Sequence, residues 1–165
     1  FTHEPYRSWF VYLLAVVDQM KPRRIIEICQ RLGLTDEEVR AILSSQAKVH
    51  AILRDLVSTK PIRPSDVVRI MEGARLEEIL FAMSKTKSPE VREMISTYIT
   101  TWRSYKPPVS GKDLIAMGFE KGKFLGDTLK LIRDKGLNGE IRDFSEATAF
   151  AARRLSERNT GQSNS

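Results

Sequence analysis

The sequence is poor in the residues that most often build a catalytic or metal centre. It has one cysteine, Cys29, and two histidines, His3 and His50, among 165 residues. A single cysteine excludes an internal disulfide and a zinc site made of several cysteines. Cys29 lies in an apolar run, where a small buried side chain is the expected role. The histidines are far apart in sequence, so we expect neither a metal site nor catalytic residues in this chain.

Local motifs of nucleotide chemistry are also missing. No two aspartates are spaced as Asp-x-Asp, the usual pair for two-metal phosphoryl transfer, and there is neither a P-loop nor a Gly-x-Gly-x-x-Gly fingerprint. No apolar run approaches the roughly 18 residues that a membrane-spanning helix needs. We therefore expect a cytoplasmic protein with no membrane contact and no bound cofactor.

What the chain does have is positive charge and enough apolar residues for a core. Lys and Arg total 27 against 21 acidic residues, which gives a net charge of +6, and 41% of the residues are hydrophobic. Such an excess favours an anionic partner, with nucleic acid as the first candidate.

The hydrophobic pattern is helical along the whole chain. Apolar residues recur at spacings of three and four, and no segment alternates for long as a strand would. Helix starts are marked by Thr35 with Glu38 and Ser110 with Asp113, and by single capping serines at 65, 88 and 145. We expect an all-α fold, an elongated assembly of about nine helices with no sheet. The predicted helices cover roughly 5–20, 22–33, 35–58, 65–72, 76–85, 88–102, 110–118, 122–135 and 145–158.

The first predicted helix carries a broad apolar face. One stripe of this face is expected to be buried, and two further residues widen it. The stripe consists of Trp9, Leu13, Val16, Val17 and Met20, and Phe10 and Leu14 lie beside it.

The composition changes after the Pro107-Pro108 pair. Six of the nine glycines lie between residues 111 and 139, which predicts short helices joined by tight turns. We divide the chain into a helical region over 1–106, a small helical RNA-binding region over 107–158, and a polar, disordered tail over 159–165.

The turn region around residues 118–123 is the best candidate for an RNA contact. Lys121, Gly122 and Lys123 stand at the predicted start of a helix, whose unpaired N–H groups and positive partial charge suit a phosphate. Lys112, at another helix start, could hold a second phosphate. Positive residues continue along this region at Lys130, Arg133, Lys135 and Arg142, and then at Arg153, Arg154 and Arg158, where a solvated face is the default interpretation.

A purely structural interpretation of the same residues stays open. Gly122 can serve turn geometry alone. The pairs Lys123–Asp127 and Lys130–Asp134 are spaced i,i+4, so both lysines can instead form ion pairs on exposed helix faces.

The same stretch resembles a known family. The residues Gly111-Lys112-Asp113-Leu114-Ile115, Gly118-Phe119, Gly122, Gly126 and Gly139-Glu140-Ile141, preceded by Tyr98-Ile99-x-x-Trp102 and Lys106-Pro107-Pro108, are those that match. They are similar to the carboxy-terminal signature of bacterial class II tRNA nucleotidyltransferases. These are the CCA-adding and A-adding enzymes, which are relatives of bacterial poly(A) polymerases. The resemblance is good over 107–141 and loose elsewhere.

The resemblance implies a modular protein with head, neck, body and tail. This chain resembles body plus tail, which in the family hold the acceptor and T arms of tRNA through its backbone. The metal-binding aspartates, Mg²⁺ and ATP, or CTP, belong to a head that is absent here, so the N-terminal catalytic domains of the same protein are expected partners. The chain begins at Phe1 rather than Met, as an excised fragment would.

Two segments approximate the family's nucleotide-reading motif, Glu-Asp-x-x-Arg. They are Asp36-Glu37-Glu38-Val39-Arg40 and Glu72-x-x-Arg75. Because acidic residues suit the first turn of a capped helix, we interpret Glu37 and Glu38 as structural.

Two alternatives to a tRNA-anchoring role remain. One is a helical protein-interaction or oligomerisation module, such as a homodimer formed through the first or third predicted helix. The other is the equivalent region of a poly(A) polymerase, which the sequence does not distinguish from a CCA-adding or A-adding enzyme.

Overall fold

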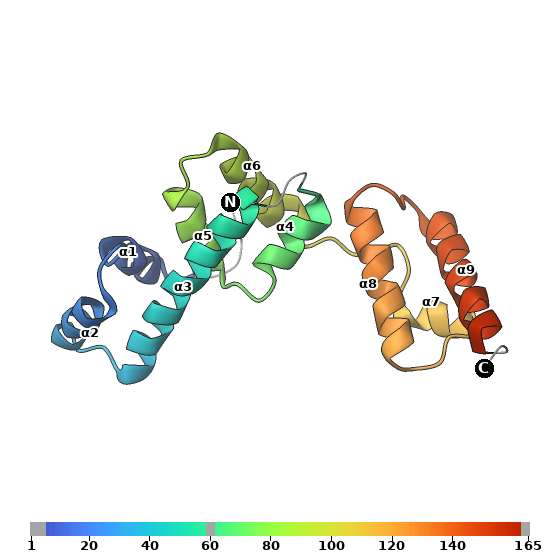
Figure 1. Ribbon diagram of the computed structural model, residues 1–165, viewed down its shortest axis with the longest axis horizontal. Helices are drawn as coiled ribbons and strands as arrows, with labels where there is room; N and C mark the ends of the chain where they lie inside the picture. The colour runs from blue at the N-terminus through green and yellow to red at the C-terminus, as the bar shows by residue number, and fades with distance from the viewer. Residues whose placement is uncertain (1–5, 59–61, 163–165) are drawn as a thin grey trace. The chain divides into compact units, whose positions relative to one another are not determined.

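The computed structural model describes residues 6–58 and 62–162 (Figure 1). Over these residues it contains nine α-helices, one π-helical turn and no strand, which confirms the all-α fold. Among the described helices, none is long and apolar enough to cross a membrane. The chain forms two compact units, one of Phe1–Ile62 with Asp66–Thr101 and one of Arg63–Ser65 with Trp102–Ser165.

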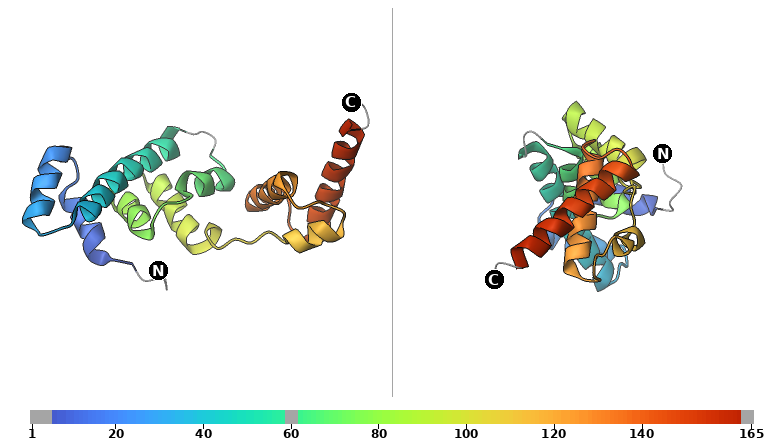
Figure 2. Two further views of the ribbon diagram at one scale, coloured as in Figure 1. Left: turned by 90° about the horizontal axis from the view of Figure 1, so that it is seen from below. Right: turned by 90° about the vertical axis from the view of Figure 1, so that its right-hand side faces the viewer.

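The first unit is built around one long helix, α3 (Asp36–Ser58). It packs against α1 (Ser8–Val16), α2 (Pro22–Arg31), α5 (Leu76–Lys85) and α6 (Pro89–Thr97), as Figures 1 and 2 show. The helix α4 (Pro64–Met71) lies between α3 and α5 in the sequence, and the π-helical turn Tyr98–Trp102 follows α6. The buried residues of this core include Leu14, Ile25, Ile42, Val49, Ile52, Ile79 and Ile95.

The start of α3 is closed by its own side chains. The N–H of Thr35 donates to Glu38 Oε2 at 2.8 Å, and the N–H of Glu38 donates to Thr35 Oγ1 at 3.3 Å. This reciprocal pair confirms the predicted capping box. The hydrogen bond from the Thr35 backbone holds the pKa of Glu38 below its ordinary value. Glu38 therefore has the structural role expected for it.

Helix α1 is shorter than predicted, and the buried part of its apolar face is shifted toward the two residues that flank the predicted stripe. It begins at Ser8 and ends at Val16, because Gln19 adopts a left-handed backbone with φ of 64° and the Asp18 carboxylate is bound by Lys85 on α5. The predicted first residue, Pro5, lies outside the described residues. The chain buries Phe10, Leu14 and Val17, whereas two members of the predicted stripe, Trp9 and Val16, are 43% and 63% exposed.

The second unit contains three helices, α7 (Gly111–Ala116), α8 (Lys123–Leu137) and α9 (Phe144–Gln162). Helix α8 packs against both α7 and α9 (Figure 2). Two alanines of α9, Ala147 and Ala151, are fully buried, and their small size lets α9 approach the core closely. The core of this unit consists of Val109, Leu114, Phe119, Ile132, Ile141, Ala147 and Ala151.

The predicted starts of two helices were wrong by one or two residues. Helix α9 begins at Phe144, one residue before the predicted cap Ser145, because Asp143 Oδ1 accepts the N–H of Glu146 at 2.8 Å. Helix α4 begins at Pro64, since proline suits the first helical position. The predicted cap Ser65 instead lies inside α4 and donates its N–H to Asn138 Oδ1 at 3.1 Å.

The end of α9 also differs from the prediction. The helix continues past Arg158 to Gln162, because Thr160 Oγ1 donates to the carbonyl of Ser156 and the polar residues there do not break the helix. The first part of the predicted disordered tail is therefore helical. Residues 163–165 of that tail lie outside the described residues.

One buried carboxylate joins α3 to α5. Glu78 is only 4% exposed. Its Oε1 accepts from Ser45 Oγ at 2.7 Å, its Oε2 accepts from the N–H of Arg75 at 2.8 Å, and Lys48 Nζ lies 3.7 Å away. A buried charge is tolerated here because each oxygen has a donor.

Replacing Glu78 with alanine should lower the free energy of unfolding by about 3 kcal/mol, because the buried hydroxyl of Ser45 and the partly buried N–H of Arg75 lose their acceptor. Urea denaturation followed by circular dichroism measures this change. The matched control is Glu72→Ala, at an exposed position, which should change stability by less than about 0.5 kcal/mol. Equal effects of the two substitutions would show that Glu78 does not hold the unit together.

Candidate nucleic-acid interface

The predicted phosphate-binding turn lies between α7 and α8. Helix α7 ends with Gly118 in a left-handed conformation, φ of 98°, and the N–H of Phe119 donates to the carbonyl of Leu114 at 3.1 Å. This glycine turn directs Phe119 into the core, where it is 3% exposed. The chain then passes through exposed Glu120 and Lys121 to the start of α8.

The start of α8 lacks a side-chain cap. Gly122 occupies the cap position with φ of 153° and ψ of −169°, a conformation close to glycine-only. Its carbonyl accepts the N–H of Gly126, but no described residue accepts the N–H groups of Lys123, Phe124 and Leu125. The positive end of a 15-residue helix is therefore open to an anion.

The start of α7 is different, because an internal carboxylate already occupies it. Ser110 donates both its N–H and its Oγ–H to Asp113 Oδ2 at 2.7 Å. The hydrogen bond from the Ser110 hydroxyl, and to a smaller extent the one from its backbone N–H, hold the pKa of Asp113 below its ordinary value. Lys112 is exposed beside this closed end, so it can offer an anion only its side-chain charge.

A shallow depression of about 450 Å³ forms at the open end of α8. Three cationic side chains, Lys121, Lys123 and Arg158, line it together with two carboxylates, Glu120 and Asp127. The structure thus brings the predicted Lys121, Gly122 and Lys123 to one place. The structure also places Arg158 of α9 at this depression, whereas the sequence pattern predicted only a solvated face for that residue.

Arg158 is held in this position by an aromatic ring. Its guanidinium lies 4.6 Å from the ring centroid of Phe124, and that of Arg154 lies 5.5 Å from the same ring. Phe124 in turn stacks on buried Phe119, with centroids 5.4 Å apart and planes 12° apart. Cation–π contacts of this kind restrict a long side chain while leaving its N–H donors available. In the sequence, the i,i+4 spacing of Arg154 and Arg158 already indicates that both residues lie on the same helix face.

The other predicted RNA-binding residues fall into two groups. Lys130 and Arg142 are exposed, and Arg133 is partly buried. Lys135 is already engaged, since its Nζ lies 2.6 Å from Glu140 Oε2 and 5.5 Å from the ring centroid of Phe150. The hydrogen bond from Lys135 holds the pKa of Glu140 below its ordinary value. Lys135 is therefore a weaker candidate for an RNA contact than the residues at the start of α8.

The alternative use of the lysines in i,i+4 ion pairs is not realised in the structure. Within the described part of the chain, neither Lys123–Asp127 nor Lys130–Asp134 closes to salt-bridge distance, whereas pairs such as Lys135–Glu140 do. The same part of the chain contains no group of three or more His, Cys, Asp or Glu side chains that could hold a metal ion.

Most of the net charge belongs to the second unit. Residues 63–65 and 102–165 contain 13 of the 27 Lys and Arg residues but 8 of the 21 acidic residues, so this unit carries +5 of the total +6. The first unit is nearly neutral. A positive field concentrated on one small helical unit is typical of proteins that contact a nucleic-acid backbone.

The fold and this face define a class, an all-helical protein whose positive charge is concentrated on its second unit. The chain is similar to the A-adding tRNA nucleotidyltransferase of Geobacter sulfurreducens, with 26% identity over 154 residues. The match covers 91% of this chain but only 18% of that protein's length. No family model matches the chain, and no solved structure does. The similarity supports the resemblance at the level of tRNA nucleotidyltransferases.

Two glycines of this face should respond to alanine with opposite signs. Gly122→Ala should lower the free energy of unfolding by about 1–3 kcal/mol, because its backbone conformation is strained for any residue with a Cβ. Gly126, inside α8 with open space around its Cβ position, should gain up to about 1 kcal/mol as alanine. Thermal denaturation of the two single variants compares them directly. A stabilising Gly122→Ala would show that the turn has another backbone geometry.

Proposed function

We propose that this chain is the tRNA-anchoring region of a tRNA nucleotidyltransferase, an enzyme that adds A, or CCA, to tRNA 3′ ends. The observation that carries the proposal is the clustering of Lys121, Lys123 and Arg158 at the uncapped start of α8. The similarity to an A-adding enzyme supports tRNA as the anion.

The arrangement suits a phosphate rather than a base. A backbone phosphate at the start of α8 would accept from the N–H groups of Lys123 and Phe124, while Lys121 and Arg158 neutralise its charge. Such contacts position a folded RNA without reading its sequence. An enzyme that acts on many different tRNAs needs contacts of this kind. They hold the 3′ end of each tRNA at a set distance from the reaction centre without depending on its sequence.

The reaction itself belongs to the rest of such an enzyme. This chain spans less than a fifth of the length of the relative that it matches. In our proposal the catalytic aspartates, Mg²⁺ and ATP, or CTP, belong to regions outside the chain, and the acceptor and T arms of tRNA meet the second unit. A poly(A) polymerase with an equivalent region would use the same contacts.

Charge reversal at the turn tests the proposal. The double variant Lys121→Glu/Lys123→Glu should bind deacylated tRNA at least about tenfold more weakly, and the slope of log affinity against log salt should fall by about 2. A fluorescence-anisotropy titration at several salt concentrations measures both values. A stem-loop that lacks the tRNA elbow should bind more weakly than tRNA to the unchanged protein.

The matched control reverses two exposed lysines of the first unit, Lys21→Glu/Lys87→Glu. The control has the same net charge, so it separates a local phosphate contact from the overall field. If both double variants lose the same affinity, the turn is not a phosphate site. If neither loses any, the chain does not anchor tRNA through this unit.

A homodimer is a second candidate, and one observation favours it. Helix α1 exposes large apolar side chains, with Tyr12 at 72% and Val16 at 63%. Such a surface is more often covered than left in water. If a second copy covers it, light scattering should give twice the chain mass independently of salt, and Tyr12→Glu/Val16→Glu should restore the monomer. A monomer at all concentrations would exclude this candidate.

A further inference from the structure

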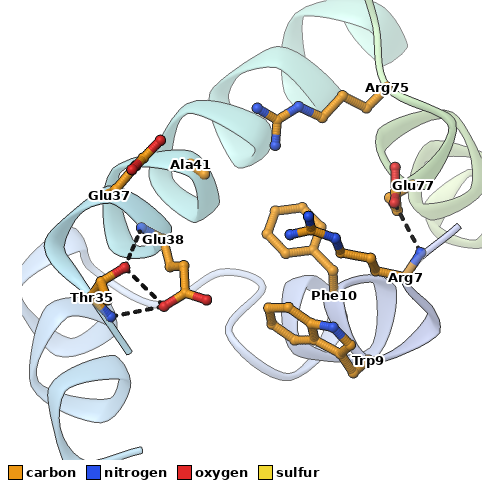
Figure 3. Close-up of a pocket in the computed structure, with 9 residues that line it drawn as sticks. All are labelled: Arg7, Trp9, Phe10, Thr35, Glu37, Glu38, Ala41, Arg75 and Glu77. Atoms are coloured by element: carbon orange, nitrogen blue, oxygen red, sulfur yellow. Dashed lines mark hydrogen bonds between the residues drawn. The ribbon is translucent and has the colours of Figure 1, made fainter. Parts of the chain in front are cut away.

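The arginines that line depressions in the two units have different surroundings. In the first unit, Arg7 and Arg75 line a depression of about 540 Å³ together with three carboxylates, those of Glu37, Glu38 and Glu77 (Figure 3). In the depression at the start of α8, three cationic side chains lie with only two carboxylates. Like charges gathered in one place repel one another, so the second depression needs a contact that holds its cations in position.

Two arginines of α9 share one aromatic ring beside this depression. Arg154 and Arg158 are four residues apart, which places them on one face of the helix. Their guanidiniums lie 5.5 and 4.6 Å from the ring centroid of Phe124. Within the described part of the chain, neither guanidinium forms an ion pair with a carboxylate. The ring of Phe124 is therefore the contact that holds both of them.

The two arginines differ in their access to a ligand. Nε of Arg154 is buried and has no hydrogen-bond partner among the described residues, so the ring rather than an acceptor fixes this side chain. Arg158 instead lines the depression together with Lys121 and Lys123. Because Arg154 already occupies part of the ring and carries the same charge, it keeps Arg158 toward the depression, where its N–H donors are available.

The ring of Phe124 is itself fixed by the core of the second unit. It stacks on Phe119, which is buried, with centroids 5.4 Å apart. The carbonyl of Phe124 accepts from Thr128 Oγ1 at 2.8 Å, and Thr128 is fully buried. An arginine that is already aligned on a fixed ring loses less conformational freedom when it binds a ligand, and this strengthens binding.

We propose that Phe124 is a positioning residue for the contact at the start of α8. It holds Arg158, with the help of Arg154, in the orientation in which its guanidinium meets a backbone phosphate. The inference rests on the proposed function, because tRNA is the ligand through which it is measured. It assigns part of the affinity to a side chain that carries no charge and touches no ligand.

The substitution Phe124→Leu tests this role, because leucine keeps an apolar side chain against Phe119 but has no π-system. Affinity for deacylated tRNA should fall about three- to tenfold. The slope of log affinity against log salt should stay unchanged, since the number of phosphate contacts is the same. Arg158→Ala, which removes one such contact, should lower that slope by about 1. Fluorescence anisotropy at several salt concentrations measures both quantities.

The matched control is Phe150→Leu. Phe150 is also partly buried against the core of the second unit, and its ring lies 5.5 Å from Lys135 Nζ, which is already bound to Glu140. This variant should change tRNA affinity by less than about twofold. Phe124→Tyr keeps an aromatic ring and should also stay within about twofold of the unchanged protein. Equal losses for Phe124→Leu and Phe150→Leu would show an effect of core packing and overturn the proposal.

A double variant separates positioning from packing. Phe124→Leu/Arg158→Ala should bind tRNA within about twofold of Arg158→Ala alone, because the ring acts through that arginine. If the two losses multiply, the ring acts in another way and the proposal fails. Urea denaturation of each variant shows whether the compared proteins are equally folded.

The positioning role and the proposed function can fail separately. If Lys121→Glu/Lys123→Glu weakens tRNA binding but Phe124→Leu does not, the positioning role is overturned and tRNA anchoring stands. If the unchanged protein does not bind tRNA, both are overturned. A readout without RNA is the Nε–H resonance of Arg158, which Phe124→Leu should shift downfield as the ring current is lost. An unchanged resonance would show that the ring does not hold this arginine in solution.

Discussion

Helix starts leave backbone N–H groups without acceptors, and the way in which this chain satisfies them decides where an anion can bind. At α3 and α7 the chain uses a side-chain carboxylate from the first turn, Glu38 and Asp113. At α8 it uses glycine, which provides no acceptor. The contrast makes the α8 start the open positive end beside Lys121 and Lys123, whereas the α7 start beside Lys112 is closed.

Aromatic rings set the position of the cationic side chains. Phe124 is supported by buried Phe119 and carries the guanidiniums of Arg154 and Arg158, so positive charge from α9 is held at the start of α8. In the first unit, Phe10 supports Trp9 in the same way beside Arg7. In both places a buried phenylalanine, Phe119 or Phe10, supports the aromatic ring beside it.

The two units divide the physical tasks between them. The first is nearly neutral and is organised by apolar packing around α3 and by the buried Glu78, which joins α3 to α5. The second is small and carries almost all of the net positive charge. Because the excess positive charge lies on the second unit, the larger core of the first unit does not have to bury unpaired cations. Burying them would cost free energy through the loss of their hydration.

The sequence alone determined the features that depend on neighbours a few residues apart. These are the helical class, the capping boxes at Thr35 and Ser110, and the glycine turn that brings Lys121, Gly122 and Lys123 together, because their atoms lie within one turn of each other. Tertiary structure decided the rest. It selected Phe10 over Trp9 for the core, buried Glu78 against Ser45, and placed Arg158 over Phe124. Each of these depends on contacts between distant residues, whose packing local periodicity does not specify.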